Sequence, residues 1–225
     1  MPFEDRSAAG RKLAAALADY KSRQPVILAL PRGGVPVAAE VAARLEAPLD
    51  LILVRKIGVP FQPELAMGAV VDGGSAIVVR NEEVIREAGI DEQEFNTIRD
   101  RELAEIERRR LHYLGMRERA EVAGRTAIVI DDGIATGATT RAALRATRMR
   151  RPKALVLAVP VAPTDTLVDM RAEADEVVCL EDHELFGAIG YYYRDFSQIS
   201  DEEVVKILER LPVKRPRPAQ SAGAD

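Results

Sequence analysis

The sequence predicts an α/β protein built on an open, mostly parallel, twisted sheet with helices on both faces. Two observations support this fold class. Short continuous apolar runs are rich in β-branched residues, and they alternate along the chain with longer segments of helical periodicity. Alternation of this kind produces a parallel sheet covered by helices on both sides. Ligands of such sheets bind at the carboxyl ends of the strands, so the loops that follow the strands are the first candidates for a site.

Strand and helix positions follow from these patterns. Strands are expected at residues 26–30, 49–54, 64–71, 75–79, 126–130, 154–160 and 176–180, and helices at residues 6–20, 37–45, 91–119, 141–146, 164–172 and 201–211. The opening helix places Leu13, Leu17 and Tyr20 on one face and is expected to cover the sheet. The charged helix at 91–119 has an apolar stripe, which consists of Phe95, Ile98, Leu103, Ile106, Leu111 and Leu114.

The length of 225 residues suffices for one well-buried α/β domain and is short for two. We therefore expect a single domain over residues 1–211, with a small C-terminal hood at about 181–200. Residues 212–225 are rich in Pro, Ala and basic residues and are predicted to form a disordered tail.

Composition narrows the classes of function. The formal net charge of −4, with 30% charged residues, gives no basic footprint for nucleic acid, and no apolar run approaches the ~20 residues of a membrane span. Cys179 is the only cysteine and the N-terminal residues lack a signal-peptide pattern, so a cytoplasmic protein is expected. With only His112 and His183 and no Cys/His cluster, zinc is not expected. Any metal should be Mg²⁺ held largely by substrate oxygens.

The most informative stretch runs from Ile128 to Thr140, where an apolar strand ends in Asp131 and Asp132 and a small-residue loop opens a helix. Candidate phosphate contacts in it are Gly133, Ala135, Thr136, Gly137, Ala138, Thr139 and Thr140. Such a helix start directs free backbone N–H groups and the positive end of the helix dipole towards one point, which suits a phosphate. The loop lacks the Lys of a P-loop and the dinucleotide pattern G-x-G-x-x-G.

The two adjacent acids argue against a site for phosphate alone, because carboxylates repel a phosphate at a few ångströms. A sugar whose hydroxyls meet the acids while its phosphate meets the loop, with a divalent cation nearby, resolves this conflict. A ribose 5-phosphate fits that description. The alternative, that Asp131 and Asp132 only cap the helix, is weaker because a cap needs one acid.

Residues 129–139, Val-Ile-Asp-Asp-Gly-Ile-Ala-Thr-Gly-Ala-Thr, resemble the phosphoribosyl diphosphate signature of the type I phosphoribosyltransferases. In that family the paired acids meet the ribose 2- and 3-hydroxyls and the next loop wraps the 5-phosphate. The resemblance covers roughly residues 25–180, and its highly specific part is the 128–140 motif. It implies the family's fold, phosphoribosyl diphosphate and a small-molecule acceptor as substrates, and a homodimer, since dimers are common in the family.

A second strand, loop and helix unit contains Pro31, Arg32, Gly33 and Gly34 at the end of the apolar run 26–30. Two glycines beside an arginine offer backbone N–H donors and a guanidinium, which match a diphosphate. The resemblance implies the same role, because the family carries its pyrophosphate loop here. An ordinary strand-to-helix turn is the alternative.

Two cations, Arg55 and Lys56, follow the expected strand at 49–54 and precede a loop with Gly58, Pro60 and Pro63. In the family a mobile loop leaves this strand, closes over the reacting centre and supplies basic contacts. The resemblance assigns that role to Arg55 and Lys56. An exposed, solvated Arg-Lys pair is the alternative.

The aromatic residues concentrate in the hood, which contains Phe186, Tyr191, Tyr192, Tyr193 and Phe196. Such rings can stack on a flat ligand, and the family has a variable hood that selects the acceptor base. Phe186 and Tyr191 are therefore the candidate acceptor contacts, although packing of an irregular cap is an alternative for any one ring. Purine-specific relatives usually have a hood lysine, and residues 181–200 contain none, which puts purine salvage in doubt.

The resemblance implies displacement at C1 of phosphoribosyl diphosphate through an oxocarbenium-like transition state. Arg32, Arg55 and Lys56 would stabilise the leaving pyrophosphate together with Mg²⁺, while Asp131 and Asp132 anchor the ribose. By analogy with the family, Asp131 also faces Mg²⁺ through water. The acceptor is expected to be a nitrogenous base that the sequence does not identify.

Two other functions fit the same residues. A regulator or sensor could keep the phosphoribosyl diphosphate site and perform little chemistry, and the missing base-recognition pattern favours it. The diphosphate loop and the Arg55-Lys56 pair favour an enzyme, because a sensor of ribose 5-phosphate alone would not need them. Hydrolysis with water as the acceptor is the third possibility. A DNA-binding regulator is disfavoured by the acidic balance.

Overall fold

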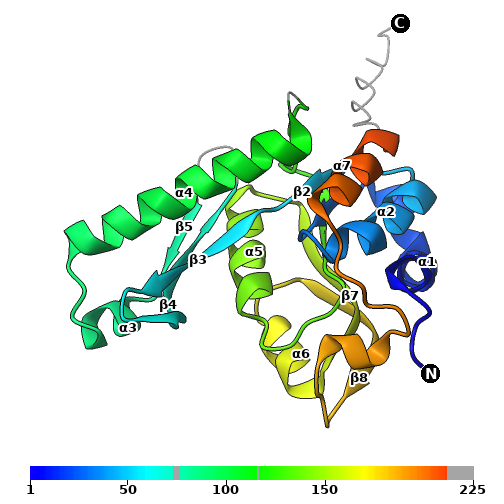
Figure 1. Ribbon diagram of the computed structural model, residues 1–225. Helices are drawn as coiled ribbons and strands as arrows, with labels where there is room; N and C mark the ends of the chain where they lie inside the picture. The colour runs from blue at the N-terminus through cyan, green and yellow to red at the C-terminus, as the bar shows by residue number, and fades with distance from the viewer. Residues whose placement is uncertain (73–76, 116, 212–225) are drawn as a thin grey trace, which may run out of the picture.

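A computed structural model describes residues 1–72, 77–115 and 117–211, apart from the side chain of Glu64. A parallel sheet with helices on both faces forms the body of the molecule, and a smaller antiparallel sheet with a long helix projects from it (Figure 1). This arrangement confirms the predicted fold class. The tail predicted at 212–225 lies outside the described residues. No helix in the described ranges is both long and apolar enough to cross a membrane.

The main sheet has five parallel strands in the order β2-β1-β6-β7-β8. They are β1 (Val26–Ala29), β2 (Leu49–Leu51), β6 (Thr126–Ile130), β7 (Ala154–Pro163) and β8 (Glu176–His183). Alternate residues of the central strands enter two separate cores, with Ile27 and Ile128 in one and Leu28 and Val129 in the other. Both faces are therefore buried, which explains the continuous apolar runs.

Helices cover the two faces of this sheet. On one face lie α1 (Arg6–Ala16), α2 (Gly34–Leu45) and α7 (Asp201–Arg210), and on the other lie α5 (Ala138–Met149) and α6 (Thr164–Met170). The opening helix ends earlier than predicted, and the chain continues as a 3-10 helix, η1 (Ala18–Arg23). The other predicted helices are present within a few residues of their expected ends.

The projecting unit, here called the arm, comprises residues 54–114. It contains β3 (Val54–Val59), β4 (Gln62–Val71), β5 (Ile77–Arg80), α3 (Glu82–Glu87) and α4 (Glu92–Leu114). Its strands pair antiparallel in the order β3-β4-β5, and α4 contacts β3 and β4 along the length of the arm (Figure 1). The expected hairpin of residues 64–71 and 75–79 is thus present, while the centre of its turn at 73–76 lies outside the described residues.

Two expectations about the arm were wrong. The strand predicted at 49–54 divides, because the chain leaves the main sheet after Ile52 and Val54 pairs with Val71 of the second sheet. Arg55 and Lys56 consequently lie on a strand and not in a loop. Leu111 of the predicted helical stripe is 56% exposed, whereas the neighbouring Tyr113 and Leu114 are buried.

Candidate functional site

The site begins where the two central strands end side by side. Ala29 of β1 and Ile130 of β6 are paired in register, and the Leu30 N–H donates to the Ile130 carbonyl at 2.9 Å. From there one loop leads into α2 at Gly34, and the other leads into α5 at Ala138. The two loops that the sequence singles out therefore lie next to each other at the carboxyl edge of the sheet.

Glycine lets these loops touch. A Cβ on Gly33 would lie 2.0 Å from Oδ2 of Asp132, and a Cβ on Gly34 would lie 2.7 Å from the Ile130 carbonyl oxygen. Real Cβ atoms do not approach other atoms this closely, so both positions need glycine for a packing reason. The peptide bond between Pro31 and Arg32 is cis. Backbone and carboxylate groups of the two loops thus form one continuous surface.

Asp132 is buried and ion-paired. Its Oδ2 accepts a hydrogen bond from Nε of Arg6 at 2.7 Å, and both side chains are about one-tenth exposed. The hydroxyl of Tyr193 donates to the Asp132 carbonyl at 2.5 Å. Burial is the main cause that raises the pKa of Tyr193, and the negative charge of Asp132 raises it further. The phenol therefore stays protonated and acts as a hydrogen-bond donor.

Arg6, Tyr193 and Phe196 surround Asp132, and the sequence analysis did not select them as candidate site residues. Arg6 is 126 positions away from Asp132 in the chain, and its guanidinium carbon lies 3.8 Å from the centroid of the Phe196 ring. No local pattern distinguishes this arginine from the other cations of its helix. The concentration of aromatic residues in the hood was a real signal, but it led to different rings.

Asp131 has a different environment from its neighbour. The residue as a whole keeps some exposure, and Oδ1 of its carboxyl group accepts the N–H of Asp132 at 2.9 Å. Burial of the carboxyl group, followed by the nearby charge of Asp132, raises the pKa of Asp131 well above its ordinary value. A cation or hydroxyl donors at this position would offset both effects.

The donor set fits a Mg²⁺ ion held mainly by a ligand. Within the described residues, no group of three His, Cys, Asp or Glu side chains could hold a metal by itself. Asp132 is already paired with Arg6, which leaves the neighbouring carboxylate of Asp131 as the other acid at the end of β6. Mg²⁺ commonly binds through one or two carboxylates plus substrate phosphates, so one available carboxylate is compatible with it.

The loop after Asp132 presents small residues to solvent at the start of α5. Ala135, Thr136, Ala138 and Thr139 are exposed, whereas Gly133, Gly137 and Thr140 are buried. Gly137 adopts a left-handed conformation with φ 74°, and no described side chain caps the helix that follows. The N–H groups of the first turn of α5 have no partner within the helix and are available to an anion. Thr140 faces the interior, contrary to its expected role as a hydroxyl donor.

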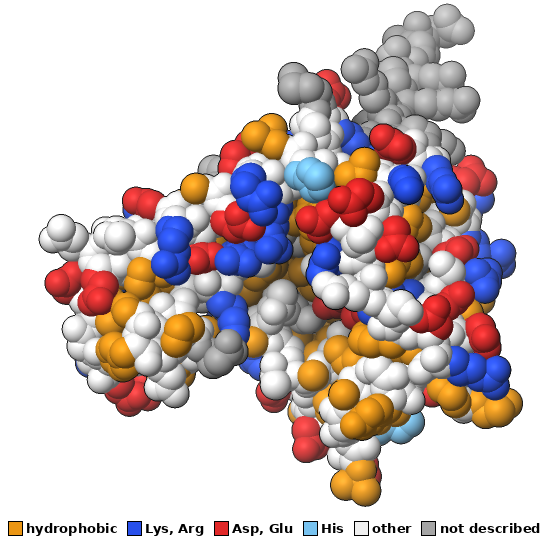
Figure 2. Space-filling view, viewed as in Figure 1, with side chains coloured by type: hydrophobic (Ala, Val, Ile, Leu, Met, Phe, Trp, Pro, Cys, Tyr) orange, Lys and Arg blue, Asp and Glu red, His pale blue; other side chains and the backbone are white. Residues whose placement is uncertain are grey.

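Lys56 and the start of α5 line the same cavity. This cavity has a volume of about 380 Å³ and lies between the arm and α5, with Lys56 and Arg80 on one side and Ala138, Thr139 and Arg141 on the other. Lys and Arg side chains gather along the arm beside the hollow that separates it from the main sheet (Figure 2). The structure therefore brings Lys56 towards the predicted phosphate site.

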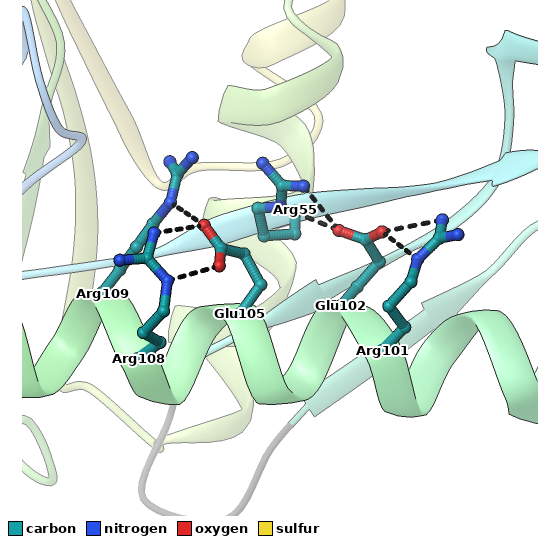
Figure 3. Close-up of polar contacts among 6 residues, drawn as sticks. All are labelled: Arg55, Arg101, Glu102, Glu105, Arg108 and Arg109. Atoms are coloured by element: carbon teal, nitrogen blue, oxygen red, sulfur yellow. Dashed lines mark hydrogen bonds and ion pairs between the residues drawn. The ribbon is translucent and has the colours of Figure 1, made fainter.

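Arg55 is held by α4. Its Nε and Nη2 lie 2.8 Å and 2.7 Å from Oε2 of Glu102, and Arg101 contacts the other oxygen of the same carboxylate (Figure 3). One turn further along α4, Glu105 accepts hydrogen bonds from Arg108 and Arg109. Arg55 lines a larger cavity of about 840 Å³ between β3, β4 and α4, which also includes Lys56 but not the loops after β1 and β6.

Arg32 contacts α7. Its Nη1 lies 3.7 Å from Oδ1 of Asp201, and the same oxygen accepts a hydrogen bond from the hydroxyl of Tyr113 at 2.6 Å. Burial and this hydrogen bond raise the pKa of Tyr113 to about 12. The guanidinium of Arg32, which is over one-third exposed, thus stands at the junction of the β1 loop, α4 and α7.

The hood rings form two groups. Tyr193 and Phe196 pack inward, next to Asp132 and Arg6. Phe186 stacks on Tyr192, and Tyr192 stacks on His183, with centroid distances of 4.9 Å and 4.5 Å. Tyr191, in the 3-10 helix η2 (Ile189–Tyr192), is 78% exposed. Neither of the two rings selected from the sequence is recorded in contact with the paired acids.

Comparisons with known proteins agree with this geometry. A family model described as the phosphoribosyl transferase domain matches residues 4–194. The chain is 48% identical over 208 residues to the "Putative phosphoribosyl transferase Rv0571c" of Mycobacterium tuberculosis H37Rv, a match that covers 92% of this chain and 46% of that protein. The chain thus spans about half the length of the curated relatives it matches.

A solved structure matches over nearly the whole chain. The crystal structure of TT1426 from Thermus thermophilus has a TM-score of 0.83 and 42% sequence identity to this chain, with 94% of this chain and 100% of that chain covered. A match of this extent takes in both the main sheet and the arm. Together with the family model, it places the chain in the phosphoribosyl transferase domain family.

Proposed function

We propose that the protein transfers the phosphoribosyl group of phosphoribosyl diphosphate to a small nitrogenous acceptor, with Mg²⁺, and releases pyrophosphate. The observation that carries this proposal is the direct contact between the β1 and β6 loops. Gly33 approaches Asp132 closely, and the two loops share one edge of the sheet. A ligand with a phosphate at one end and a diphosphate at the other suits that pair of loops.

The ribose 5-phosphate half would be held by the β6 loop. The exposed Thr136 and Thr139 and the free N–H groups at the start of α5 would bind the 5-phosphate. Asp131 and Asp132 would hold the ribose hydroxyls and stabilise the positive charge that develops near C1. Burial and the charge of Asp132 raise the pKa of Asp131 in the free protein, whereas hydroxyl donors and a growing positive charge would both favour its ionised form.

The diphosphate half would lie against the β1 loop, with Arg32, Gly33 and Gly34 as its first contacts. Asp131 would help to hold a Mg²⁺ ion, which would supply charge neutralisation for the leaving group when bound. Lys56 lines the 380 Å³ cavity between the arm and α5, and from the arm it can add a positive charge beside the bound phosphates. Arg55 would join it only after its ion pair with Glu102 is exchanged for the ligand.

The acceptor would approach between the hood and the arm. We keep Phe186 and Tyr191 as acceptor contacts because Tyr191 is 78% exposed and Phe186 is partly exposed, whereas Tyr193 is buried. Ile189 is a further hood contact, since its Cγ2 lies 2.7 Å from the position of a Cβ on Gly133. An apolar group at that point would shield the ribose end of the site from water.

A sensor of phosphoribosyl diphosphate is the second candidate. The observation in its favour is that Arg55 and Arg32 are already paired with Glu102 and Asp201, so neither cation is preorganised for a leaving group. A sensor would bind phosphoribosyl diphosphate and release little pyrophosphate with any acceptor. Hydrolysis would instead give pyrophosphate without any base present.

Pyrophosphate release distinguishes these functions. Wild-type protein with Mg²⁺ and phosphoribosyl diphosphate would be assayed alone and then with a panel of nitrogenous bases. We expect release that depends on one class of base and that falls by about 10²–10³ in Asp131→Asn, as is typical when a preorganised electrostatic contact is lost. Asp19→Asn, an exposed acid in η1, is the matched control and should release pyrophosphate at the wild-type rate.

Base-independent release would establish hydrolysis, and tight binding without release would establish a sensor. Near-wild-type release by Asp131→Asn would contradict the proposed transfer mechanism, because the adjacent Asp132 is already ion-paired with Arg6.

A further inference from the structure

Arg6 is a buried cation in an unfavourable place for a helix. It is the first residue of α1, where Asp5 is the cap, and it is 8% exposed. The positive end of the helix dipole disfavours a cation at this end, and burial removes its hydration. An apolar side chain would suit the helix better, so local helix stability does not explain the arginine.

The guanidinium of Arg6 makes three different contacts with its surroundings. Nε donates to Asp132 at 2.7 Å, Nη1 donates to the Ser197 carbonyl at 2.9 Å, and the planar face lies over the Phe196 ring. A lysine has no planar fork and could not make these three contacts together. The arginine therefore joins α1, the hood and the β6 loop at a single point.

The N-terminal segment is also attached to the hood through its backbone. The Phe3 N–H donates to the Tyr192 carbonyl, and the Arg194 N–H donates to the Phe3 carbonyl, both at 2.8 Å. The Phe3 ring lies 5.5 Å from the Tyr193 ring, whose hydroxyl reaches the Asp132 backbone. Arg6 and the hood thus approach Asp132 from the same side as a connected unit.

We propose that Arg6 is a positioning residue for ribose recognition. Its ion pair holds the Asp132 carboxylate in one orientation against Gly33 and balances one of the two adjacent negative charges. Asp131 can then face the ribose and the metal without a second unpaired carboxylate beside it. The inference rests on the proposed function, because the ribose of phosphoribosyl diphosphate is the group that would be recognised.

Two probe ligands separate positioning from folding. Calorimetric titration with ribose 5-phosphate reports the acids and the phosphate loop together, whereas inorganic phosphate reports the phosphate loop alone. The variants are Arg6→Met, Arg6→Lys and the control Arg11→Met. Arg11 lies on the same helix, but its side chain is 60% exposed and its contact with Glu40 is long, at 3.4 Å.

We expect Arg6→Met to bind ribose 5-phosphate about tenfold more weakly than Arg11→Met and to bind inorganic phosphate equally well. Arg6→Lys should recover part of the loss, because it keeps the charge near Asp132 but not the fork. If Arg6→Met does not fold, Phe196→Leu takes its place in the experiment. This variant keeps the ion pair between Arg6 and Asp132 but removes the aromatic ring under the guanidinium. It should then show the same ligand-selective loss at a smaller size.

Equal weakening of both ligands in the folded Arg6 variants, or no weakening of either, would overturn the positioning role while leaving the proposed function intact. If wild-type protein binds neither ribose 5-phosphate nor inorganic phosphate, the proposed function itself is overturned. Thermal unfolding of each variant shows which samples are folded, so the two failures remain distinguishable.

Discussion

The loops after β1 and β6 form the floor of the site, here called the base of the site. This base and the arm beside it hold their polar groups in opposite ways. In the base, the loops after β1 and β6 meet through glycines, and the strands beneath them are fully buried. In the arm, the polar contacts are ion pairs between β3 and α4 and along α4 itself. The base of the site is thus held by close backbone contacts and buried strands, while the arm presents cations whose positions depend on neighbouring acids.

This difference implies different responses to change. A close backbone contact has no room to relax, so substitutions in the base should act through steric overlap and through buried charge. Exposed ion pairs are screened by water and salt, so substitutions in the arm should cost less and depend on conditions. Substitutions in the two regions can therefore test this contrast.

Gly33→Ala should affect folding and activity together, because the new Cβ would lie 2.0 Å from Oδ2 of Asp132. That oxygen cannot move aside cheaply, since Arg6 binds it at 2.7 Å. We expect the free energy of unfolding to fall by about 2–3 kcal/mol and pyrophosphate release to fall by about 100-fold. Urea denaturation and the release assay measure the two effects.

Gly89→Ala, at a turn of the arm, is the matched control for this substitution. Gly89 has φ 66°, and no described atom beyond its chain neighbours lies within 4 Å of the position of a Cβ. Only the left-handed backbone then opposes the alanine, at a cost of about 1 kcal/mol. Equal loss of activity in both variants would refute the idea that close contact between the loops is what the site requires.

Substitutions of the two adjacent acids should affect folding and ligand binding differently. Asp132→Asn breaks a buried ion pair and leaves Arg6 uncompensated, so the free energy of unfolding should fall by about 3 kcal/mol. Asp131→Asn removes a carboxylate whose pKa is raised by burial, so it should not destabilise the fold although it abolishes ligand binding. Urea denaturation of both variants gives the comparison. Equal destabilisation would show that the two environments do not differ as the structure indicates.

Glu102→Gln tests how the arm holds its cations. The Glu102 side chain is 8% exposed and joins Arg55 on β3 to α4. Its loss should lower the free energy of unfolding by about 1.5 kcal/mol, since a charge-assisted hydrogen bond between two elements disappears. Hydrogen exchange should become faster in β3 and α4, while amides of β1 and β6 keep their protection. Faster exchange throughout the molecule would mean that arm and base do not behave differently.

Glu105→Gln should have the smallest effect. Hydrogen bonds from Arg108 and Arg109 lower the pKa of Glu105 from 4.5 to about 2 in the folded protein. A lowered folded-state pKa gives stability that is fully present above pH 4.5 and is lost as the pH falls towards 2. Because these ion pairs are largely exposed, we expect a difference from wild type below ~1 kcal/mol at neutral pH. Urea denaturation at pH 7 and pH 3 should show this difference shrinking at the lower pH.

The strands and loops at the base of the site could be predicted from the sequence because each depends on a short, local pattern of residues. Continuous apolar runs indicate strands buried on both faces, and the glycines and threonines that follow them indicate loops that open helices. The strand ends at Ala29 and Ile130 then meet because neighbouring parallel strands end at the same edge. The family resemblance pointed to the same two loops.

The arm and the Asp132 environment depend on partners that are distant in the chain. Arg55 follows an apolar run that looks like one strand, and only its pairing with β4 and with Glu102, 47 residues away, shows that it belongs to a second sheet. Arg6 is separated from Asp132 by 126 residues. Periodicity and composition carry no information about such pairs, so these contacts required the structure.

We propose that the β1 and β6 loops together bind phosphoribosyl diphosphate. Calorimetric titration of phosphoribosyl diphosphate into wild type, Asp131→Asn and Asp19→Asn, each with and without Mg²⁺, tests it most directly. We predict Mg²⁺-dependent binding to wild type and Asp19→Asn, and loss of that binding in Asp131→Asn. Absence of binding to the folded wild type, or equal binding by Asp131→Asn, would contradict the claim.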